Sequence, residues 1–404
     1  MQSRELYTQE LSKYIDKPII KVITGIRRSG KSFLLKLLKD KLISQGIRDD
    51  QIIYINYESL SYDDYRDYSS LYSYVKNKIK DHQSRSYLLI DEIQEVSQWE
   101  KAIRSFSVDF DCDIYITGSN ANLLSGELAT YLSGRYVSFQ LFTLSFQEYI
   151  NFNSIPNKKD EIKEGFENFI KYGGFPGLIH MDNDQETQFK YLDGIYNTII
   201  LKDVIQRNNI RDPELLNRIL LFIMDNIGQL FSAKNISGYL VSQGRKTSTK
   251  TIYKFMNSLE DAFVIHSAKR YDVKGKRILQ KVEKIFLSDL GLRHAILGYR
   301  EMDIAQIIEN VVYLELLRRN YKVYVGREGK YEIDFIALKN KKKVYIQVTY
   351  LLASKRTIER EFRPLKNIKD NFPKYVLSMD DIHQEDKEGI KWMNIIDFLL
   401  GENF

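Results

Sequence analysis

Short apolar stretches alternate with amphipathic stretches along the first 150 residues. Runs rich in β-branched and aromatic residues predict strands, and apolar residues that recur every three to four positions predict the helices between them. Strands separated by helices are typical of parallel crossover units, which bind ligands at the carboxyl ends of their strands. The predicted fold class is therefore α/β with a parallel sheet. Its strands are expected at 19–24, 51–57, 87–91, 113–117 and 136–141, with a first helix at 33–43.

The pattern changes beyond the fifth strand. It becomes predominantly helical up to about residue 210, with one sharp turn cluster, YGGFPG, at 172–177. Three amphipathic helices and a hairpin follow, and the hairpin turns at Lys274-Gly275-Lys276. The remainder begins with a helix and continues with strands. We therefore predict four parts, at 1–145, 146–211, 212–300 and 301–404.

A glycine-rich loop follows the first strand, in the stretch ITGIRRSGKSFLL. Gly25, Gly30, Lys31 and Ser32 fit the pattern G-x-x-x-x-G-K-[ST], in which backbone N–H groups curl around an anion and the next helix points its positive end at it. The lysine of this pattern neutralises the β- and γ-phosphates, and the serine hydroxyl ligates Mg²⁺. We predict a site for ATP and Mg²⁺ lined by Gly25, Ile26, Arg27, Arg28, Ser29, Gly30, Lys31, Ser32 and Phe33.

Polar residues at the ends of the later strands are candidates for the chemistry. The third strand ends in Asp91 and Glu92, which suits Asp91 as a metal ligand and Glu92 as the group that polarises the attacking water. Ser119 and Asn120 follow the fourth strand, where they either reach the γ-phosphate or the water or form an ordinary turn. Arg135 precedes the fifth strand, where it is a candidate arginine finger or phosphate sensor, or an ordinary strand-entry residue.

A family resemblance adds to this interpretation. The stretches VITGIRRSGKS, YLLIDEIQEVSQWE, YITGSNANLLSGELATYLSGRYVSFQLFTLSFQEY and YGGFPGL resemble AAA+ ATPases of bacteria and archaea that carry a C-terminal domain of unassigned function. The resemblance covers nearly the whole chain and implies a helical lid at 146–211. It also implies a ring of identical subunits, a hexamer or heptamer, in which an arginine finger reaches a neighbour's nucleotide. The residues to which it gives roles are Lys31, Ser32, Asp91, Glu92, Asn120 and Arg135.

Composition restricts the class and the compartment. The chain has 404 residues, of which 43% are hydrophobic and 28% charged, as is ordinary for a globular protein of more than one domain. Its single cysteine, Cys112, excludes an internal disulfide and fits a reducing cytoplasm. The sequence shows no apolar run of membrane-spanning length and has a charged N-terminus without a signal peptide, so we expect a cytoplasmic protein with no membrane partner.

The net charge of +6 is concentrated in one segment. Residues 244–284 hold eleven lysines and arginines and four acids, and three helices followed by a hairpin are the outline of a winged helix. A basic winged helix indicates DNA binding, mostly through phosphates, although a solvated basic face or a surface for protein contacts and ring assembly fits the same pattern. The candidate DNA contacts are Arg245, Lys246, Lys250, Lys254, Lys274, Lys276 and Arg277.

The last segment partly matches the PD-(D/E)xK nucleases, in which carboxylates hold a divalent metal and a lysine assists the attacking water. Glu309 and Asp334, with Glu332 nearby, occupy the first two positions. Gln347 replaces the second acid and Thr349 replaces the lysine. The sequence therefore predicts a nuclease-like domain that is degenerate, so that a scaffold for nucleic acid or for the assembly is an alternative to a working nuclease.

Three function classes remain open. The first is a Mg²⁺-dependent AAA+ ATPase that binds and remodels DNA, branched DNA included, and it is the hypothesis that we favour. The second is an ATP-regulated, metal-dependent DNA nuclease, and the third is a nucleotide-gated signalling or protein-interaction ATPase. The histidines and the cysteine are not spaced as zinc ligands, and the sequence contains no G-x-S-x-G or Cys/His arrangement of another hydrolase class.

Overall fold

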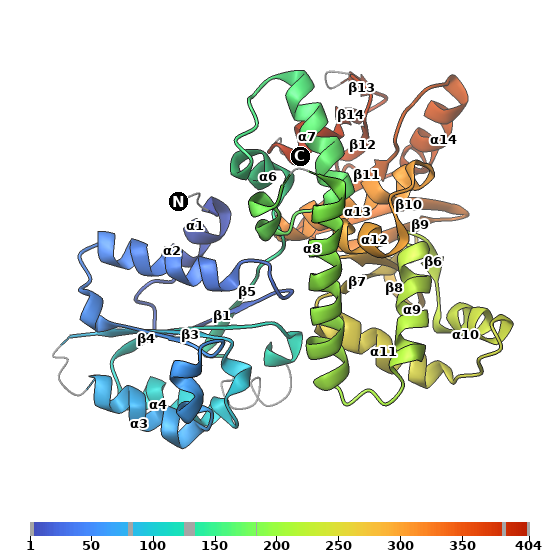
Figure 1. The fold of residues 1–404 in the computed structure, drawn as a ribbon. Coiled ribbons are helices and arrows are strands. Elements are labelled where there is room, and N and C mark those ends of the chain that lie inside the picture. The colour runs from blue at the N-terminus through green and yellow to red at the C-terminus, as the bar shows by residue number, and fades with distance from the viewer. Residues whose placement is uncertain (1–3, 80–83, 125–133, 183, 382–384, 402–404) are drawn as a thin grey trace. The chain divides into compact units, whose positions relative to one another are not determined.

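The computed structural model describes residues 4–79, 84–124, 134–182, 184–381 and 385–401 (Figure 1). The chain forms two compact units, each built around its own sheet. The first unit comprises Met1–Thr143 with Asp261–Phe263, and the second comprises Leu144–Glu260 with Val264–Phe404. Within the described ranges, no helix combines the length and the apolar character needed to cross a membrane.

The first unit contains a five-stranded sheet in the order β2-β3-β4-β1-β5, and every neighbouring pair of strands is parallel. This confirms the predicted fold class, and each strand begins and ends within one residue of its predicted position. The strands are β1 (Ile20–Thr24), β2 (Ile52–Asn56), β3 (Ser86–Asp91), β4 (Cys112–Gly118) and β5 (Tyr136–Gln140). The helices are α1 (Glu5–Ser12), α2 (Lys31–Ser44), α3 (Tyr68–Ile79) and α4 (Trp99–Asp109), with short 3-10 turns η1 (Asp49–Gln51), η2 (Leu60–Tyr65), η3 (Ile93–Glu95) and η4 (Ala121–Leu124).

Helices cover both faces of this sheet, with α1 and α2 on one side and α3 and α4 on the other (Figure 1). Leu34 and Leu38 of α2 belong to the apolar core of the first side, and Val75 of α3 belongs to that of the second. Because both faces are covered, all five residues of β1 are buried. The one charged residue of β1, Lys21, forms an ion pair with Asp113 of β4 inside the sheet.

The second unit begins with the helical segment that the pattern predicts and continues with further helices. The third of the predicted amphipathic helices is α11 (Thr249–Asp261). Its apolar side chains are all buried, namely Ile252, Phe255, Met256 and Leu259. The helices are α6 (Phe146–Phe152), α7 (Lys159–Tyr172), η5 (Pro176–His180), α8 (Gln185–Thr198), the π-helix η6 (Ile199–Gln206), α9 (Pro213–Asp225), α10 (Ala233–Ser242), α11 (Thr249–Asp261), α12 (Leu290–Leu297), η7 (Glu301–Asp303), α13 (Ile304–Arg318), α14 (Lys355–Lys366) and α15 (Ile395–Leu399).

The second unit also contains a nine-stranded mixed sheet, in the order β13-β14-β12-β11-β10-β9-β7-β8-β6. The predicted hairpin forms β7 and β8, and β7 pairs in parallel with β9. The boundary predicted after residue 300 therefore falls between segments that share one sheet. The strands are β6 (Leu230–Phe231), β7 (Ile265–Asp272), β8 (Arg277–Leu287), β9 (Lys322–Glu328), β10 (Tyr331–Lys339), β11 (Lys342–Val348), β12 (Lys374–Ser378), β13 (Glu385–Lys387) and β14 (Ile390–Asn394).

Candidate functional site

The loop between β1 and α2 has a backbone that few side chains allow. Gly25, Arg28 and Gly30 have φ values of 150°, 67° and 99°. A Cβ atom on Gly25 would lie 2.1 Å from the carbonyl oxygen of Leu141, so only glycine fits there. Gly30 is the N-cap of α2, where the free N–H groups and the helix dipole favour an anion. The loop has the form of a phosphate seat.

Lys31 and Ser29 supply polar groups to this loop. Lys31 is 4% exposed, and its Nζ donates to the carbonyl oxygens of Gly25 at 3.1 Å and Ile26 at 3.3 Å. Ser29 Oγ is buried and has no hydrogen-bond partner in the part of the chain that the structure describes. A buried ammonium beside an unpaired hydroxyl fits a ligand that brings negative charge and acceptor oxygens, as the phosphates of ATP do.

Asp91 lies beside Ser32 at the carboxyl end of β3. Its side chain is fully buried, and burial raises its pKa, while hydrogen bonds with the hydroxyls of Ser32 and Thr117 act in the opposite direction. The Tyr54 hydroxyl donates to Asp91 Oδ2 at 3.5 Å. A carboxylate next to a serine hydroxyl at a phosphate loop is the ligand set that Mg²⁺ uses in nucleotide sites. The residues present therefore fit the predicted metal.

Glu92 directly follows Asp91 and has a left-handed backbone, with φ of 56°. Its N–H donates to Thr117 Oγ1 at 3.0 Å, and its carboxylate accepts a hydrogen bond from Gln94. Glu92 Oε1 lies 3.6 Å from Lys31 Nζ, and both side chains are almost completely buried. A non-glycine residue held at positive φ is strained, and such strain is concentrated at functional sites. The structure thus places the predicted acid beside the predicted phosphate-binding lysine.

The end of β4 contributes to the same edge of the sheet. Ser119 and Asn120 follow Gly118 directly and are 0% and 3% exposed. β3 and β4 are parallel neighbours, so their carboxyl ends meet at one edge. Roles for Ser119 and Asn120 stay predictions. Thr117 was not among the predicted residues, although a threonine at the tip of a buried strand, next to a predicted polar turn, is the type of residue that orients neighbouring acids.

Arg135 lies elsewhere. It precedes β5, and its carbonyl oxygen accepts a hydrogen bond from Ile20 N, at the first residue of β1. The phosphate loop begins after the last residue of β1, about 15 Å away at 3.3 Å per residue. The structure therefore does not bring Arg135 to the loop of its own chain. Within one subunit it belongs to the opposite edge of the sheet.

The other predicted loop residues differ in their surroundings. Ile26 is buried and Phe33 is half-buried. The Nη1 atom of Arg27 lies 3.3 Å from Glu58 Oε1, in an ion pair. The side chain of Arg28 is exposed to solvent. All of them belong to the loop or to the first turn of α2, and their contacts with a nucleotide stay predictions.

Comparisons with known proteins agree with this geometry. Residues 17–150 match the AAA domain, and residues 163–303 match a domain of unknown function (DUF8612). An uncharacterized protein of Haemophilus influenzae is 40% identical over 99% of both chains. An uncharacterized protein of Methanocaldococcus jannaschii is 30% identical over 91% of this chain and 85% of that one. Residues 17–150 therefore form an AAA domain, and the whole chain belongs to one family with these two uncharacterized proteins.

Solved structures of AAA+ proteins are more distant. The ORC1 protein of Aeropyrum pernix was solved in complex with DNA and shares 11% sequence identity with this chain. The alignment covers 73% of this chain and 92% of the ORC1 chain, with a TM-score of 0.35. RuvB of Thermotoga maritima shares 13% identity over 65% of this chain and 89% of its own, with a TM-score of 0.33. Similarity at this level carries no argument about function.

The predicted DNA contacts lie outside the AAA domain, and most are exposed. Arg245 is the exception, because its guanidinium pairs with Asp212 Oδ2 at 2.6 Å and is partly neutralised. No ion pair to the other six is found within the described ranges, and all six are exposed on α11, before it or at the turn of the β7–β8 hairpin: Lys246, Lys250, Lys254, Lys274, Lys276 and Arg277. Within the described ranges, these six side chains are therefore exposed cations without an ion-pair partner.

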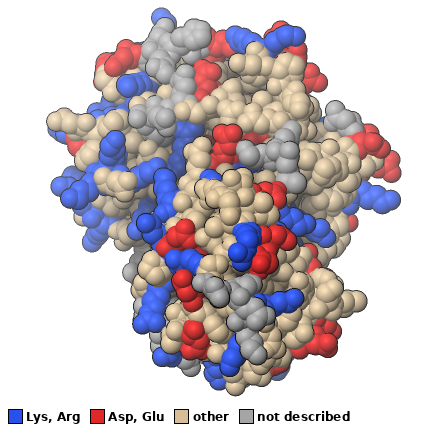
Figure 2. All heavy atoms as spheres, turned by 90° about the vertical axis from the view of Figure 1, so that its left-hand side faces the viewer, with Lys and Arg blue, Asp and Glu red and all other residues tan. Residues whose placement is uncertain are grey.

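The charge of the surface is mixed elsewhere. On the face drawn in Figure 2, lysines and arginines predominate toward the left of the view, and over the rest they lie among aspartates and glutamates. The modest net charge of +6 agrees with this mixture. Binding of DNA would therefore depend on a local group of cations rather than on the whole molecule.

The acids of the predicted nuclease-like site do come together, but around a lysine. Lys284 of β8 lies with its Nζ 2.6 Å from Glu309 Oε1, 2.9 Å from Glu332 Oε1 and 3.6 Å from Asp334 Oδ1. Lys284 is 3% exposed. Burial alone would lower the pKa of Lys284, but the three carboxylates outweigh it and raise the pKa. Lys284 is therefore a buried ion-pair residue, and its place in the basic surface segment was a wrong interpretation.

Gln347 and Thr349 differ from the nuclease pattern in the structure as in the sequence. Gln347 Oε1 accepts a hydrogen bond from Asp334 N at 3.4 Å, and its Nε2 donates to Glu361 Oε2 at 3.1 Å. The amide therefore bridges two groups instead of presenting a charge. Among the described residues, no group of three or more His, Cys, Asp or Glu side chains has the geometry to hold a metal ion.

Proposed function

We propose that this protein is a Mg²⁺-dependent ATPase whose AAA domain hydrolyses ATP and whose second unit binds DNA. The observation that carries the ATPase is the group formed by Lys31, Ser32, Asp91 and Glu92 at the carboxyl edge of the parallel sheet. Lys31 Nζ lies 3.6 Å from Glu92 Oε1, and the Ser32 hydroxyl is hydrogen-bonded to the Asp91 side chain. The match of residues 17–150 to the AAA domain supports the same activity.

Each residue of this group has a distinct part in the proposed reaction. Lys31 leaves its carbonyl partners to neutralise the β- and γ-phosphates of ATP. Ser32 and Asp91 would hold Mg²⁺, which neutralises developing phosphate charge when it is bound. Glu92 orients the attacking water and accepts its proton. Thr117 fixes the backbone of Glu92 through its hydroxyl.

The second unit supplies the proposed DNA surface. Its elements follow the order α9–β6–α10–α11–β7–β8, with β6 paired to β8, which is the order of a winged helix. The exposed lysines of α11 and of the hairpin turn would contact DNA phosphates and give affinity without sequence preference. ATP turnover in a ring of subunits would then change how DNA, branched DNA included, is held.

The nuclease alternative has less support. The order α13–β9–β10–β11–α14–β12 fits a nuclease-like domain. The Lys284 ammonium, however, lies where the carboxylates of Glu309 and Asp334 converge, and Gln347 and Thr349 replace an acid and a lysine of the pattern. We propose a scaffold that does not cut DNA.

Steady-state ATP hydrolysis with single-stranded, duplex and four-way-junction DNA at two salt concentrations tests the proposal. Lys31→Ala and Glu92→Gln should abolish turnover, whereas Lys36→Ala, on the exposed side of α2, and Glu95→Gln should not. Stimulation by DNA that weakens with salt is expected. Turnover that ignores every DNA form would overturn the DNA part alone and favour a protein-directed switch. Turnover that survives Lys31→Ala would overturn the ATPase itself.

A further inference from the structure

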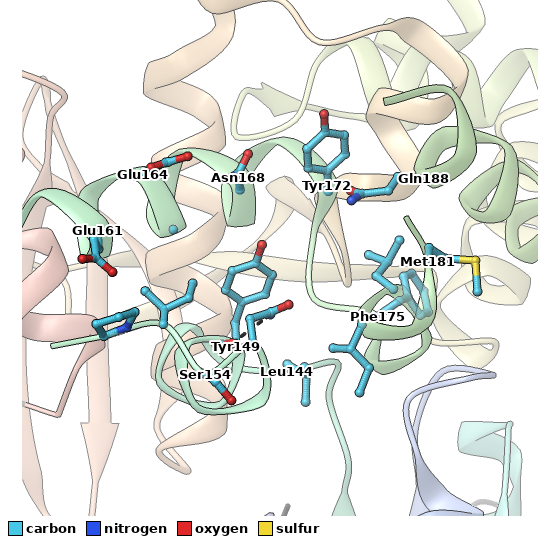
Figure 3. A pocket seen from close by; sticks show the side chains of 16 residues that line it. Leu144, Tyr149, Ser154, Glu161, Glu164, Asn168, Tyr172, Phe175, Met181 and Gln188 are labelled. Atoms are coloured by element: carbon cyan, nitrogen blue, oxygen red, sulfur yellow. Dashed lines mark hydrogen bonds between the residues drawn. The ribbon is translucent and has the colours of Figure 1, made fainter. Parts of the chain in front are cut away.

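A pocket of about 440 Å³ lies in the second unit, between α7 and the α6 helix with the loop that follows it (Figure 3). Glu164 and Asn168 line it from α7, and Tyr149 projects from α6 toward that helix. Phe175 and Met181, which follow α7, close the other end. The volume falls in the range of pockets that bind small molecules. The phosphate loop belongs to the first unit, so this pocket is a separate site.

The pocket has a buried floor and fixed walls. Phe175 and Leu178 are 1% and 8% exposed, and Gln188 is 7% exposed. Gly165 lies at the point where α7 packs against the loop that follows α6. A Cβ atom at this position would lie only 2.8 Å from Ile155 Cδ1. This close approach brings the loop against the helix and shapes the pocket without a ligand. A pre-formed site loses little conformational entropy on binding.

Several polar groups at the pocket have their hydrogen-bonding capacity free. The side chains of Tyr149, Tyr172, Asn168 and Glu164 make no hydrogen bond or ion pair with any residue in the ranges that the structure covers. Burial raises the pKa of Tyr149 to about 12, and the neighbouring phenol of Tyr172 adds to this effect. The Tyr149 hydroxyl therefore stays neutral and can donate to or accept from a ligand.

The charge of the pocket is negative. Two carboxylates, Glu161 and Glu164, line it, and no lysine, arginine or histidine is among its described lining residues. Glu161 pairs with Lys158 at 3.0 Å, which leaves Glu164 as the carboxylate with the free charge. The phenol ring of Tyr149 adds a face that attracts a cation, whereas the ring of Tyr172 already has the Lys171 ammonium 5.0 Å from its centroid. Phosphates and other anions would meet like charge here.

We propose that this pocket binds a small organic cation, an amine or guanidinium joined to an apolar or aromatic body. The cationic group lies at Glu164 and the tyrosine hydroxyls. The apolar body extends toward Phe175 and Met181, at the opposite end of the pocket in Figure 3. The ligand needs both a cationic group and an apolar body. A bare cation would leave the apolar end of the pocket empty, and an apolar molecule would leave the Glu164 carboxylate without a partner.

Calorimetric titration of the full-length protein with four matched probes tests this proposal. Tryptamine carries the amine and an aromatic body, indole-3-propionate carries a carboxylate on the same body, 3-ethylindole lacks the charge, and ethylamine lacks the ring. Tryptamine is expected to bind about three- to five-fold more tightly than each of the others, because Glu164 is exposed and an exposed ion pair contributes only modestly.

Variants locate the binding. Glu164→Gln keeps the shape of the side chain and should weaken tryptamine binding about three- to five-fold. Asn168→Trp should abolish binding by filling the pocket, whereas Glu167→Gln, an exposed acid of α7 outside the lining, should have no effect. Equal binding of indole-3-propionate, an unchanged Glu164→Gln variant, or no tryptamine binding at millimolar concentration would each overturn the proposal. Glu164→Gln keeps the test valid if Asn168→Trp does not fold.

Discussion

At the residue scale, Lys284 shows how far local charge can mislead. It is one of eleven cations in a basic segment, yet its ammonium is buried among the carboxylates of Glu309, Glu332 and Asp334. Loss of this cation would leave the largely buried carboxylates of Glu309 and Asp334 without a partner, whereas Glu332 is 34% exposed. This lysine joins β8 to α13 and β10 and thereby stabilises the second unit.

We predict that Lys284→Met destabilises the protein by about 3–5 kcal/mol, because it leaves buried carboxylates without a cation. Chemical denaturation followed by circular dichroism measures the loss. Lys276→Met, on the exposed hairpin turn, is the matched control and should change stability little. Adding Glu309→Gln to Lys284→Met should recover part of the loss. A Lys284→Met variant as stable as the control would show that the ion pairs contribute nothing net.

Two histidines of the second unit make its stability depend on pH. Burial lowers the pKa of His266 and of His294 to about 4, and His294 Nδ1 lies 2.9 Å from the carbonyl oxygen of Lys171. Below pH 6.5 these histidines become protonated in the unfolded chain but stay neutral in the folded chain. Their contribution to the free energy of unfolding is therefore fully present above pH 6.5 and is lost as the pH drops toward 4. Each histidine contributes up to about 3 kcal/mol to this fall.

Urea unfolding at pH 7 and pH 5 tests this dependence. The double variant His266→Gln/His294→Gln should lose less stability between the two pH values than the unmodified protein does. His180→Gln, an exposed histidine, should leave the difference unchanged. If the double variant shows the same loss as the unmodified protein, other groups cause the acid sensitivity.

At the scale of elements, local patterns predict the first unit better than the second. The strands of the parallel sheet are apolar almost throughout, and the phosphate loop has a fixed spacing, so both can be found from neighbouring residues alone. The segment 322–338, by contrast, shows no strong turn signal beyond Gly329, and the structure divides it into β9 and β10. The contact of Lys284 with Glu309 depends on pairing between distant segments, which no local pattern contains.

The α11 helix and the β7–β8 turn should act together as one DNA surface. We predict that changing Lys250, Lys254, Lys274 and Lys276 to Gln weakens DNA binding and lowers the slope of log K against log[salt] by about 0.9 for each phosphate that the variant no longer neutralises. Fluorescence anisotropy at several salt concentrations measures both. Arg245→Gln should change the slope less, because Asp212 already neutralises that guanidinium. An unchanged slope in the quadruple variant would place the DNA surface elsewhere.

At the scale of the whole molecule, the two edges of the parallel sheet carry different candidate residues. Lys31 and Glu92 lie at the carboxyl edge, whereas Arg135 lies at the amino edge of the same sheet, about 15 Å from the start of the phosphate loop. An arginine so placed cannot reach the nucleotide of its own chain. If it takes part in hydrolysis, it does so on a neighbouring subunit, and the site is then complete only in an oligomer.

We predict that Arg135→Ala and Lys31→Ala are each inactive as pure proteins but restore ATP hydrolysis when mixed. In a mixed oligomer, an Arg135→Ala subunit still has its own Lys31, and a neighbouring Lys31→Ala subunit can present Arg135 to its nucleotide. Recovery should rise with the mixing ratio to a maximum and vanish at concentrations too low for assembly. An arginine that acted within its own chain would give no recovery at any ratio, because no subunit would then hold both residues. A fully active Arg135→Ala protein would instead identify it as an ordinary strand-entry residue.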